Sequence, residues 1–151
     1  LAAAVTTRLG FGKTDVIQML NGCIGGLVAI TAEPLMPSPL ASILIGAVGG
    51  VIVVYGTKLL FSLKIDDVVG AIPAHLFAGI WGTLAVPITN SGASFGTQLL
   101  GVVSINAFVF IVSFIVWFLM KSTFGIRLSK EGETKGTDVT ETGVIAYAIR
   151  D

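Results

Sequence analysis

Long stretches without charged side chains are the feature of this sequence that most restricts its fold. No Asp, Glu, Lys or Arg occurs between Asp15 and Glu33, between Glu33 and Lys58, or between Asp67 and Lys121. Only 12% of the residues are charged, whereas soluble domains have about 25%. Because a helix that crosses a membrane needs about 20 mostly apolar residues, the sequence predicts an all-α, polytopic membrane protein.

Four membrane-spanning helices fit these stretches, near residues 15–33, 39–61, 70–88 and 97–121. The last stretch has room for two helices, and the Pro, Asn, Ser and Gly residues between Val86 and Gly96 predict the turn that separates them. Residues 1–12 are expected to be the end of a truncated earlier span and the loop that follows it. We therefore expect a transmembrane region over 1–126 and a cytosolic C-terminal tail over 127–151.

Basic residues predict the orientation of the spans. They precede the first full span, follow the second and follow the fourth: Arg8, Lys13, Lys58, Lys64, Lys121, Arg127, Lys130 and Lys135. With four alternating spans these residues fall on one side, and the charge expected on the other side is Glu33. Because cytosolic loops are enriched in Lys and Arg, the C-terminus is expected in the cytosol, with the protein in a plasma or inner membrane.

Small residues recur at a spacing of four within two of the expected spans. The pairs are Gly22 with Gly26 and Gly46 with Gly50. In lipid, small residues at this spacing let helix backbones approach closely. Because glycine is frequent in membrane helices generally, the pairs predict a tight bundle and indicate no particular function.

Several kinds of chemistry lack their sequence signals. No Cys/His cluster has metal-ligand spacing, so we expect no metal and no other cofactor. The single Cys23 rules out a disulfide within the chain. The glycines match no phosphate-binding loop, and a surface for nucleic acid is incompatible with lipid. The sequence therefore does not indicate an enzyme.

His75 is the one histidine of the chain, and it lies in the apolar segment DDVVGAIPAHLFAGIWG. An ionisable residue within a membrane span is by default a functional-site hypothesis. Pore or relay duty is therefore favoured for His75, and a structural role is the alternative. Ala71 lies one helical turn earlier, so it is a second candidate to line the same pathway.

Asp66 and Asp67 stand at the expected start of the third span. Carboxylates at that end of a helix interact favourably with its free N–H groups, so we expect a capping role rather than ion coordination. Pro73 has no backbone N–H. Either it kinks the helix, or residues 66–72 are irregular and the helix begins near Pro73. Both alternatives place His75 beside an unusual backbone feature.

Three segments resemble motifs of the ammonium transporter (Amt/Mep/Rh) family. LNGCIGGLVAITA, Leu20–Ala32, is similar to the family's N-G-x-x-x-G-L-V-A-I-T segment. DDVVGAIPAHLFAGIWGTL resembles its segment from paired aspartates to a conduction-pore histidine, and KGTDVTETGVIAY, Lys135–Tyr147, resembles its G-x-D-x-x-E-x-G-x-x-A-Y signature. The chain departs from the pattern at Pro73, Thr137 and Thr142, where glycine, leucine and histidine are common in the family.

The resemblance implies an eleven-helix fold, with this chain as its C-terminal portion and last four helices, assembled as a homotrimer with one pore per subunit. It implies that ammonium or ammonia crosses the membrane through a hydrophobic pore in which His75 is the second of two histidines. The first histidine belongs to an earlier helix outside this sequence. The alternatives are an ammonium sensor of the same fold that signals through its tail, and a non-conducting membrane anchor subunit.

The polar tail also carries signals of local structure. Thr137 or Asp138 is expected to cap a short turn, with Glu141 near the third position of a capping box. Gly143 is expected to leave that turn in the left-handed conformation.

The resemblance further implies that the tail docks on the cytosolic face, couples the pores of neighbouring subunits and offers a site for a PII-type regulatory protein. A solvated, partly disordered terminus is the alternative. The residues expected to form this regulatory tail are Gly136, Asp138, Glu141, Gly143 and Tyr147.

Overall fold

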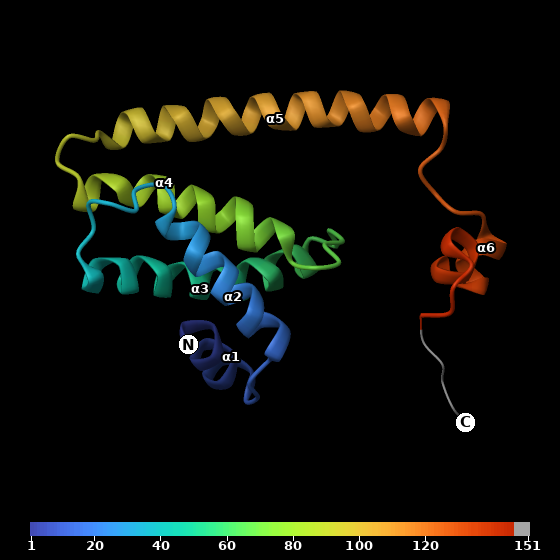
Figure 1. Ribbon diagram of the computed structural model, residues 1–151, viewed down its shortest axis with the longest axis horizontal. Helices are drawn as coiled ribbons and strands as arrows, with labels where there is room; N and C mark the ends of the chain where they lie inside the picture. Colours follow the sequence, from blue (N-terminus) through green and yellow to red (C-terminus); the bar gives the residue numbers. More distant parts are fainter. Residues whose placement is uncertain (147–151) are drawn as a thin grey trace. The chain divides into compact units, whose positions relative to one another are not determined.

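The computed structural model describes residues 1–146, and every regular element in this range is helical (Figure 1). The elements are α1 (Ala2–Phe11), α2 (Val16–Ile30), α3 (Pro39–Ser62), the π-helix η1 (Ile72–Phe77), α4 (Ala78–Thr89), α5 (Phe95–Thr123), α6 (Lys130–Lys135) and the π-helix η2 (Asp138–Thr142). The chain divides into two compact units, Leu1–Asn106 and Ala107–Asp151. The all-α class predicted from the sequence is confirmed.

Three helical stretches of the described chain are long and apolar enough to cross a membrane. They are α3 with 24 residues, the continuous stretch Ile72–Thr89 with 18 residues, and α5 with 29 residues. The apolar helix α2 has only 15 residues, fewer than the roughly 20 that a span needs. Helices therefore occupy all four expected ranges, but a membrane crossing by α2 stays a prediction.

The starts of α2 and α3 carry ordinary capping groups. Asp15 Oδ1 accepts a hydrogen bond from the N–H of Gln18 at 3.0 Å. Ser38 Oγ accepts one from the N–H of Ala41 at 3.3 Å, and Pro39 occupies the first turn of α3, where a missing N–H costs nothing. These bonds give partners to amides that have none within their own helix.

Glycines let α2 and α3 pack backbone against backbone. A Cβ atom on Gly26 would lie 3.1 Å from the carbonyl oxygen of Gly46, and one on Gly49 would lie 2.7 Å from the carbonyl oxygen of Gly25. A Cβ atom on Gly50 would likewise lie 3.6 Å from the carbonyl oxygen of Gly22. The close packing predicted from the glycine spacing is therefore confirmed for this pair of helices.

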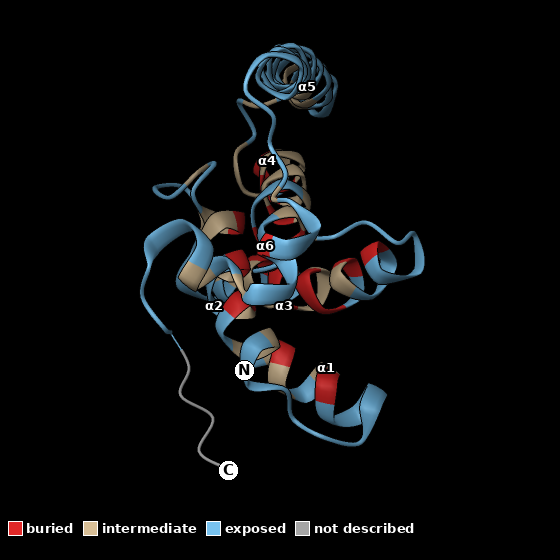
Figure 2. Ribbon diagram, turned by 90° about the vertical axis from the view of Figure 1, so that its right-hand side faces the viewer, coloured by how far each residue is buried: buried red, intermediate tan, exposed pale blue. Residues whose placement is uncertain are grey.

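Most buried residues of the unit Leu1–Asn106 lie in α2, α3, η1 and α4, and a few lie in α1 (Figure 2). Ala29, Ile45 and Ala85 form one apolar cluster, with Trp81 packed against it. The indole N–H of Trp81 donates to the carbonyl oxygen of Ile45 at 3.0 Å, which fixes α4 against α3. The first unit is thus held by small side chains and by specific bonds such as this one between helices.

A second bond joins two loops of the same unit. The side-chain amide of Asn90, after α4, donates to Glu33 Oε2, after α2, at 3.0 Å. Both side chains are half-buried. Glu33, the charge that the orientation argument places alone on its side of the membrane, therefore has a hydrogen-bonding partner.

The unit Ala107–Asp151 contains α6 and η2, which pack on each other. Ser129 caps α6 by accepting a hydrogen bond from the N–H of Gly132 at 3.1 Å. The carbonyl oxygen of the buried Gly132 accepts from Thr140 Oγ1 at 3.2 Å. The bond from Thr140 to Gly132 therefore joins η2 to α6, while Ser129 stabilises the start of α6 itself.

Candidate functional site

The segment between α3 and η1 is an irregular turn with two left-handed residues. Lys64 has φ 57°, which is uncommon for a residue that is not glycine, and Gly70 has φ 74°. The N–H of Ile65 donates back to the carbonyl oxygen of Leu60 at 3.0 Å, so the chain folds over the end of α3 before it re-enters a helix. The turn brings residues 66–71 to the start of the helix that carries His75.

The two aspartates of this turn differ in their contacts. Asp67 Oδ1 accepts from the N–H of Ala71 at 2.9 Å, and Asp67 Oδ2 accepts from the N–H of Ile72 at 2.8 Å. Both carboxylate oxygens therefore hold amides at the start of η1. Asp66 is exposed, and its side chain makes no hydrogen bond within residues 1–146.

Pro73 lies in the first turn of η1, so the helix begins beside it and is not kinked by it. This is the second of the two alternatives that the sequence left open. The N–H of Ala78 reaches the carbonyl oxygen of Pro73, five residues back, which is the π-helical pattern. π-Helical turns are rare and occur frequently at functional sites.

His75 lies in the middle of this π-helical turn with an exposed side chain. Neither ring nitrogen forms a hydrogen bond with any residue in the range 1–146. Within the unit Leu1–Asn106, it lines an open groove of about 300 Å³. The polar side chains in that groove, besides His75, are Thr83, Gln98 and Asn106.

Ala71 precedes η1 and acts as its N-terminal cap residue, with an exposed side chain. Its backbone is already helical, with φ −66° and ψ −41°, but the π-helical turn that follows changes the spacing at which side chains share a face with His75. Its place in a substrate pathway stays a prediction, as does the interior orientation of His75.

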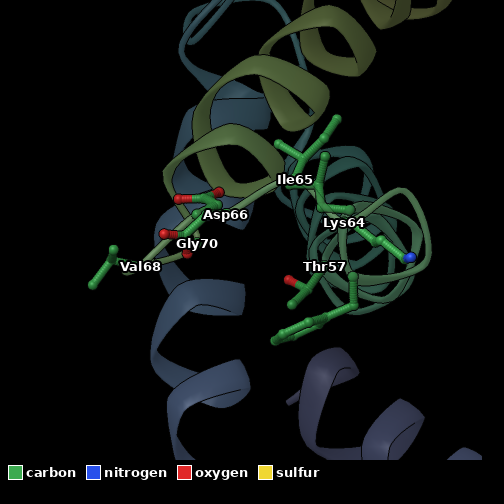
Figure 3. A pocket seen from close by; sticks show the side chains of 9 residues that line it. Thr57, Lys64, Ile65, Asp66, Val68 and Gly70 are labelled. Atoms are coloured by element: carbon green, nitrogen blue, oxygen red, sulfur yellow. The ribbon is translucent and has the colours of Figure 1, made fainter.

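A separate pocket of about 350 Å³ lies under the turn, at the end of α3 (Figure 3). Its walls combine the carboxylates of Asp66 and Asp67 with Thr57, Lys64 and apolar side chains such as Phe61. Figure 3 shows the Lys64 side chain extending away from Asp66. No sequence signal marked this pocket, because it depends on the left-handed turn at Lys64.

Asn21 is a site residue that the sequence reasoning missed. It is a buried polar side chain in α2, and its amide donates to the carbonyl oxygen of Val69 at 2.9 Å. The usable signal was an amide side chain inside an otherwise apolar run, because such a group needs a partner when buried.

In the tail, the predicted capping box is wrong. Thr137 makes no side-chain cap bond, and Asp138 Oδ2 instead accepts from the N–H of Ala146 at 2.8 Å, beyond the end of η2. That N–H, more than any other group, lowers the pKa of Asp138 below its ordinary value. Glu141 is exposed and not bonded back to the start of η2.

The other tail residues fall in different places. Gly143 has φ 68° and ends η2, so the predicted left-handed exit is confirmed. Gly136, with φ 107°, separates α6 from η2. Val144 and Ile145 are exposed, and Tyr147 lies outside the described residues. Within residues 1–146, no three His, Cys, Asp or Glu side chains are grouped so that they could hold a metal ion.

Comparison with known proteins gives consistent matches along the chain. A sequence profile of the Ammonium Transporter Family matches residues 1–147. Ammonium transporter Amt2 of Archaeoglobus fulgidus is 35% identical over 167 residues, covering 97% of this chain and 36% of that protein. Ammonium transporter Amt1 of Haloferax mediterranei is 36% identical over 152 residues, covering 97% of this chain and 30% of that protein.

The chain therefore spans about a third of the length of the curated relatives it matches. The profile covers nearly all of it, from the apolar helices through the tail. The long apolar helices make it an integral membrane protein. On this evidence the chain belongs to the ammonium transporter family, whose members are transporters and not enzymes.

Proposed function

We propose that this chain is the C-terminal portion of a transporter that carries ammonium or ammonia across a membrane, through a hydrophobic pore beside His75. The observation that carries the proposal is the position of His75, on a π-helical turn within an apolar helix, in a member of the ammonium transporter family. Because the chain spans about a third of its relatives, other helices would supply the rest of the pore, including an earlier histidine.

Desolvation explains why such a pore favours ammonia over a bare cation. Moving an unpaired charge from water into an apolar environment is costly. An alkylammonium group titrates near 10.4 in water, and desolvation lowers that value. An apolar pore therefore promotes separation of the proton from ammonia. Potassium has a similar charge and size but no proton to release, so it cannot follow this route.

The imidazole of His75 suits this chemistry because it can accept, donate or pass a proton. Each ring nitrogen can also form a hydrogen bond to ammonia. Neither nitrogen is occupied by a described residue, so both are available to a substrate or to a second histidine. Ala71, at the start of the same helix, is proposed to line the pathway between His75 and the turn that precedes η1.

The wider architecture is part of the same proposal. The helices α2, α3, η1 with α4, and α5 are assigned as the last four of an eleven-helix subunit, within a homotrimer in a plasma or inner membrane. The distribution of basic residues supports a cytosolic C-terminus. The tail is proposed to dock on that face, where Gly136, Asp138, Glu141, Gly143 and Tyr147 would influence neighbouring pores and a PII-type protein.

A sensor of the same fold is the second candidate function. In the tail, α6 and η2 pack on each other, and the N–H of Ala146 donates to Asp138 Oδ2 at 2.8 Å. Such a compact segment suits signalling. Flux separates the two functions, because a transporter must carry its substrate in reconstituted vesicles and a sensor need not.

The direct experiment is His75→Ala in the full-length protein, reconstituted into vesicles. Ammonium uptake, or selectivity for ammonium over potassium, should fall by about tenfold or more, since positioned proton-transfer groups contribute at least that much. Thr83→Ala is the matched control, because Thr83 lines the same groove but cannot relay protons as imidazole does. Wild-type uptake and selectivity in the His75 variant would contradict the proposal.

A further inference from the structure

We propose that Asn21 is a positioning residue for His75, acting from another helix through the turn that precedes η1. Its first support is burial. Asn21 is only 9% exposed and lies in the apolar helix α2. An amide in such a place is costly unless it is bonded, and the bond it makes is to the carbonyl oxygen of Val69.

The second support is the shape of the turn at the next residue. Gly70 has φ 74°, and a Cβ atom there would collide with Nδ2 of Asn21. The Asn21 amide therefore occupies the space that only a glycine leaves open. The bond to Val69 and the close contact at Gly70 fix two consecutive residues of the turn against α2.

The third support is a short chain of backbone bonds from this turn to His75. The carbonyl oxygen of Gly70 accepts from the N–H of Ala74 at 3.2 Å, and Ala74 directly precedes His75. The Asp67 carboxylate holds the N–H groups of Ala71 and Ile72 on the same turn. A displacement of Val69 and Gly70 would therefore reach the backbone that orients the imidazole.

Through this arrangement α2 helps to orient His75, although the Asn21 side chain bonds to the turn and not to the imidazole. The consequence for transport rests on the function proposed above. The consequence for the geometry of the turn does not, because it follows from the bonds alone. The experiment is therefore designed with readouts of both kinds.

The variants are made in the full-length protein. Asn21→Leu keeps a similar side-chain size but removes the donor to Val69. Gln18→Leu is the matched control: Gln18 lies one turn earlier on α2 and accepts from Thr57 Oγ1 at 3.4 Å, so it touches α3 and not the turn. Gly70→Ala is a second variant, which displaces the Asn21 amide from the other side and also strains the turn, because a residue with a Cβ rarely adopts φ 74°. Asn21→Leu is therefore the variant that isolates the contribution of the amide.

Two measurements do not depend on transport. Amide hydrogen exchange over residues 67–77 should become about tenfold faster in Asn21→Leu and Gly70→Ala, as expected when a buried hydrogen bond is lost. The rate at which diethyl pyrocarbonate modifies His75, measured on its peptide by mass spectrometry, should change in the same two variants. Gln18→Leu should leave both rates at the wild-type value.

Unchanged exchange in folded Asn21→Leu and Gly70→Ala proteins would overturn the proposal. Faster exchange with an unchanged His75 modification rate would also overturn it, since Asn21 would then hold only the turn. Where the wild-type protein transports ammonium, selectivity against potassium should fall in Asn21→Leu and not in Gln18→Leu. A wild-type protein without flux would defeat the proposed function, while the modification rate would still decide the role of Asn21.

Discussion

The helices of the unit Leu1–Asn106 and the tail helices α6 and η2 are held together by opposite means. In the first, contact depends on missing side chains: Gly25, Gly49 and their neighbours bring backbones together. In the tail, contact depends on added polar atoms, since Thr140 Oγ1 and the Asp138 carboxylate bond to backbone groups. Both regions also contain side-chain bonds to the backbone, such as that of Trp81 in the first, but a run of glycines brings whole helix backbones into contact only in the first.

The difference follows from the solvent that each region is expected to meet. Lipid tails are as apolar as leucine, so helices in a membrane gain little from burying large apolar side chains and associate through close packing. Water competes for every hydrogen bond in an exposed tail, and a short helix there is marginal without tertiary support. Glycine packing therefore carries more of the contact between helices in the first region, and side-chain bonds to the backbone carry more of it in the tail.

The largest expected effect is on the glycine packing. Gly82→Ala places a Cβ atom against the backbone of Ala29, which cannot move aside as a side chain could. Overpacking of this kind costs about 1–3 kcal/mol. Gly79→Ala, on the same helix, meets only Val28 Cγ1 at 3.7 Å and is the control. Thermal unfolding in detergent should show a lower midpoint for Gly82→Ala, and equal midpoints would break the comparison.

A smaller effect is expected at the end of η2. Gly143→Ala meets no steric obstacle, because nothing lies within 4 Å of an added Cβ atom. Its cost comes only from the left-handed conformation, which costs a residue with a Cβ about 1 kcal/mol. Gly143→Asn should be better tolerated, because asparagine enters that conformation more readily. The amide hydrogen exchange rate over residues 138–146 should rise more in Gly143→Ala than in Gly143→Asn. Equal rates in Gly143→Ala and the wild type would show that the left-handed exit carries no strain.

The smallest effect concerns pH. The N–H of Ala146 lowers the pKa of Asp138 below its ordinary value of 3.8. A lowered pKa in the folded state means that the bond stabilises the tail above pH 3.8 and that this contribution is lost as the pH falls through the folded-state pKa. The amide chemical shift of Ala146 should report the transition, and Asp138→Asn should remove it. An Ala146 amide chemical shift that does not change as the pH is lowered in the wild-type protein would contradict the hydrogen bond to Asp138.

Hydropathy and charge were enough to predict the helical class and the approximate ranges of the helices, because these depend on local composition. The glycine contacts between α2 and α3 were also predictable from spacing. The length of α2 was not, since Thr31 already ends the helix near Ile30, before the charge-free run is over. Loop geometry of this kind depends on tertiary contacts.

Two residues of the candidate site were singled out from the sequence. His75 was marked by its isolation in an apolar run, and Asp67 by its place before a helix. The bond from Asn21 to Val69 and the turn at Lys64 were missed because each depends on a residue distant in sequence or on an unusual φ value. In the tail, the capping box failed because Asp138 bonds forward to Ala146 rather than to its own helix.

The length of α5 ties this chain to the thickness of its bilayer. Its 29 residues rise about 1.5 Å each, giving roughly 43 Å, whereas the hydrocarbon core is about 30 Å thick. A helix with this excess must tilt, extend beyond the core or thicken the lipid around it. Each adjustment costs a fraction of a kcal/mol per ångström of mismatch. We therefore expect the thickness of the lipid around this protein to set the tilt of α5 in the membrane.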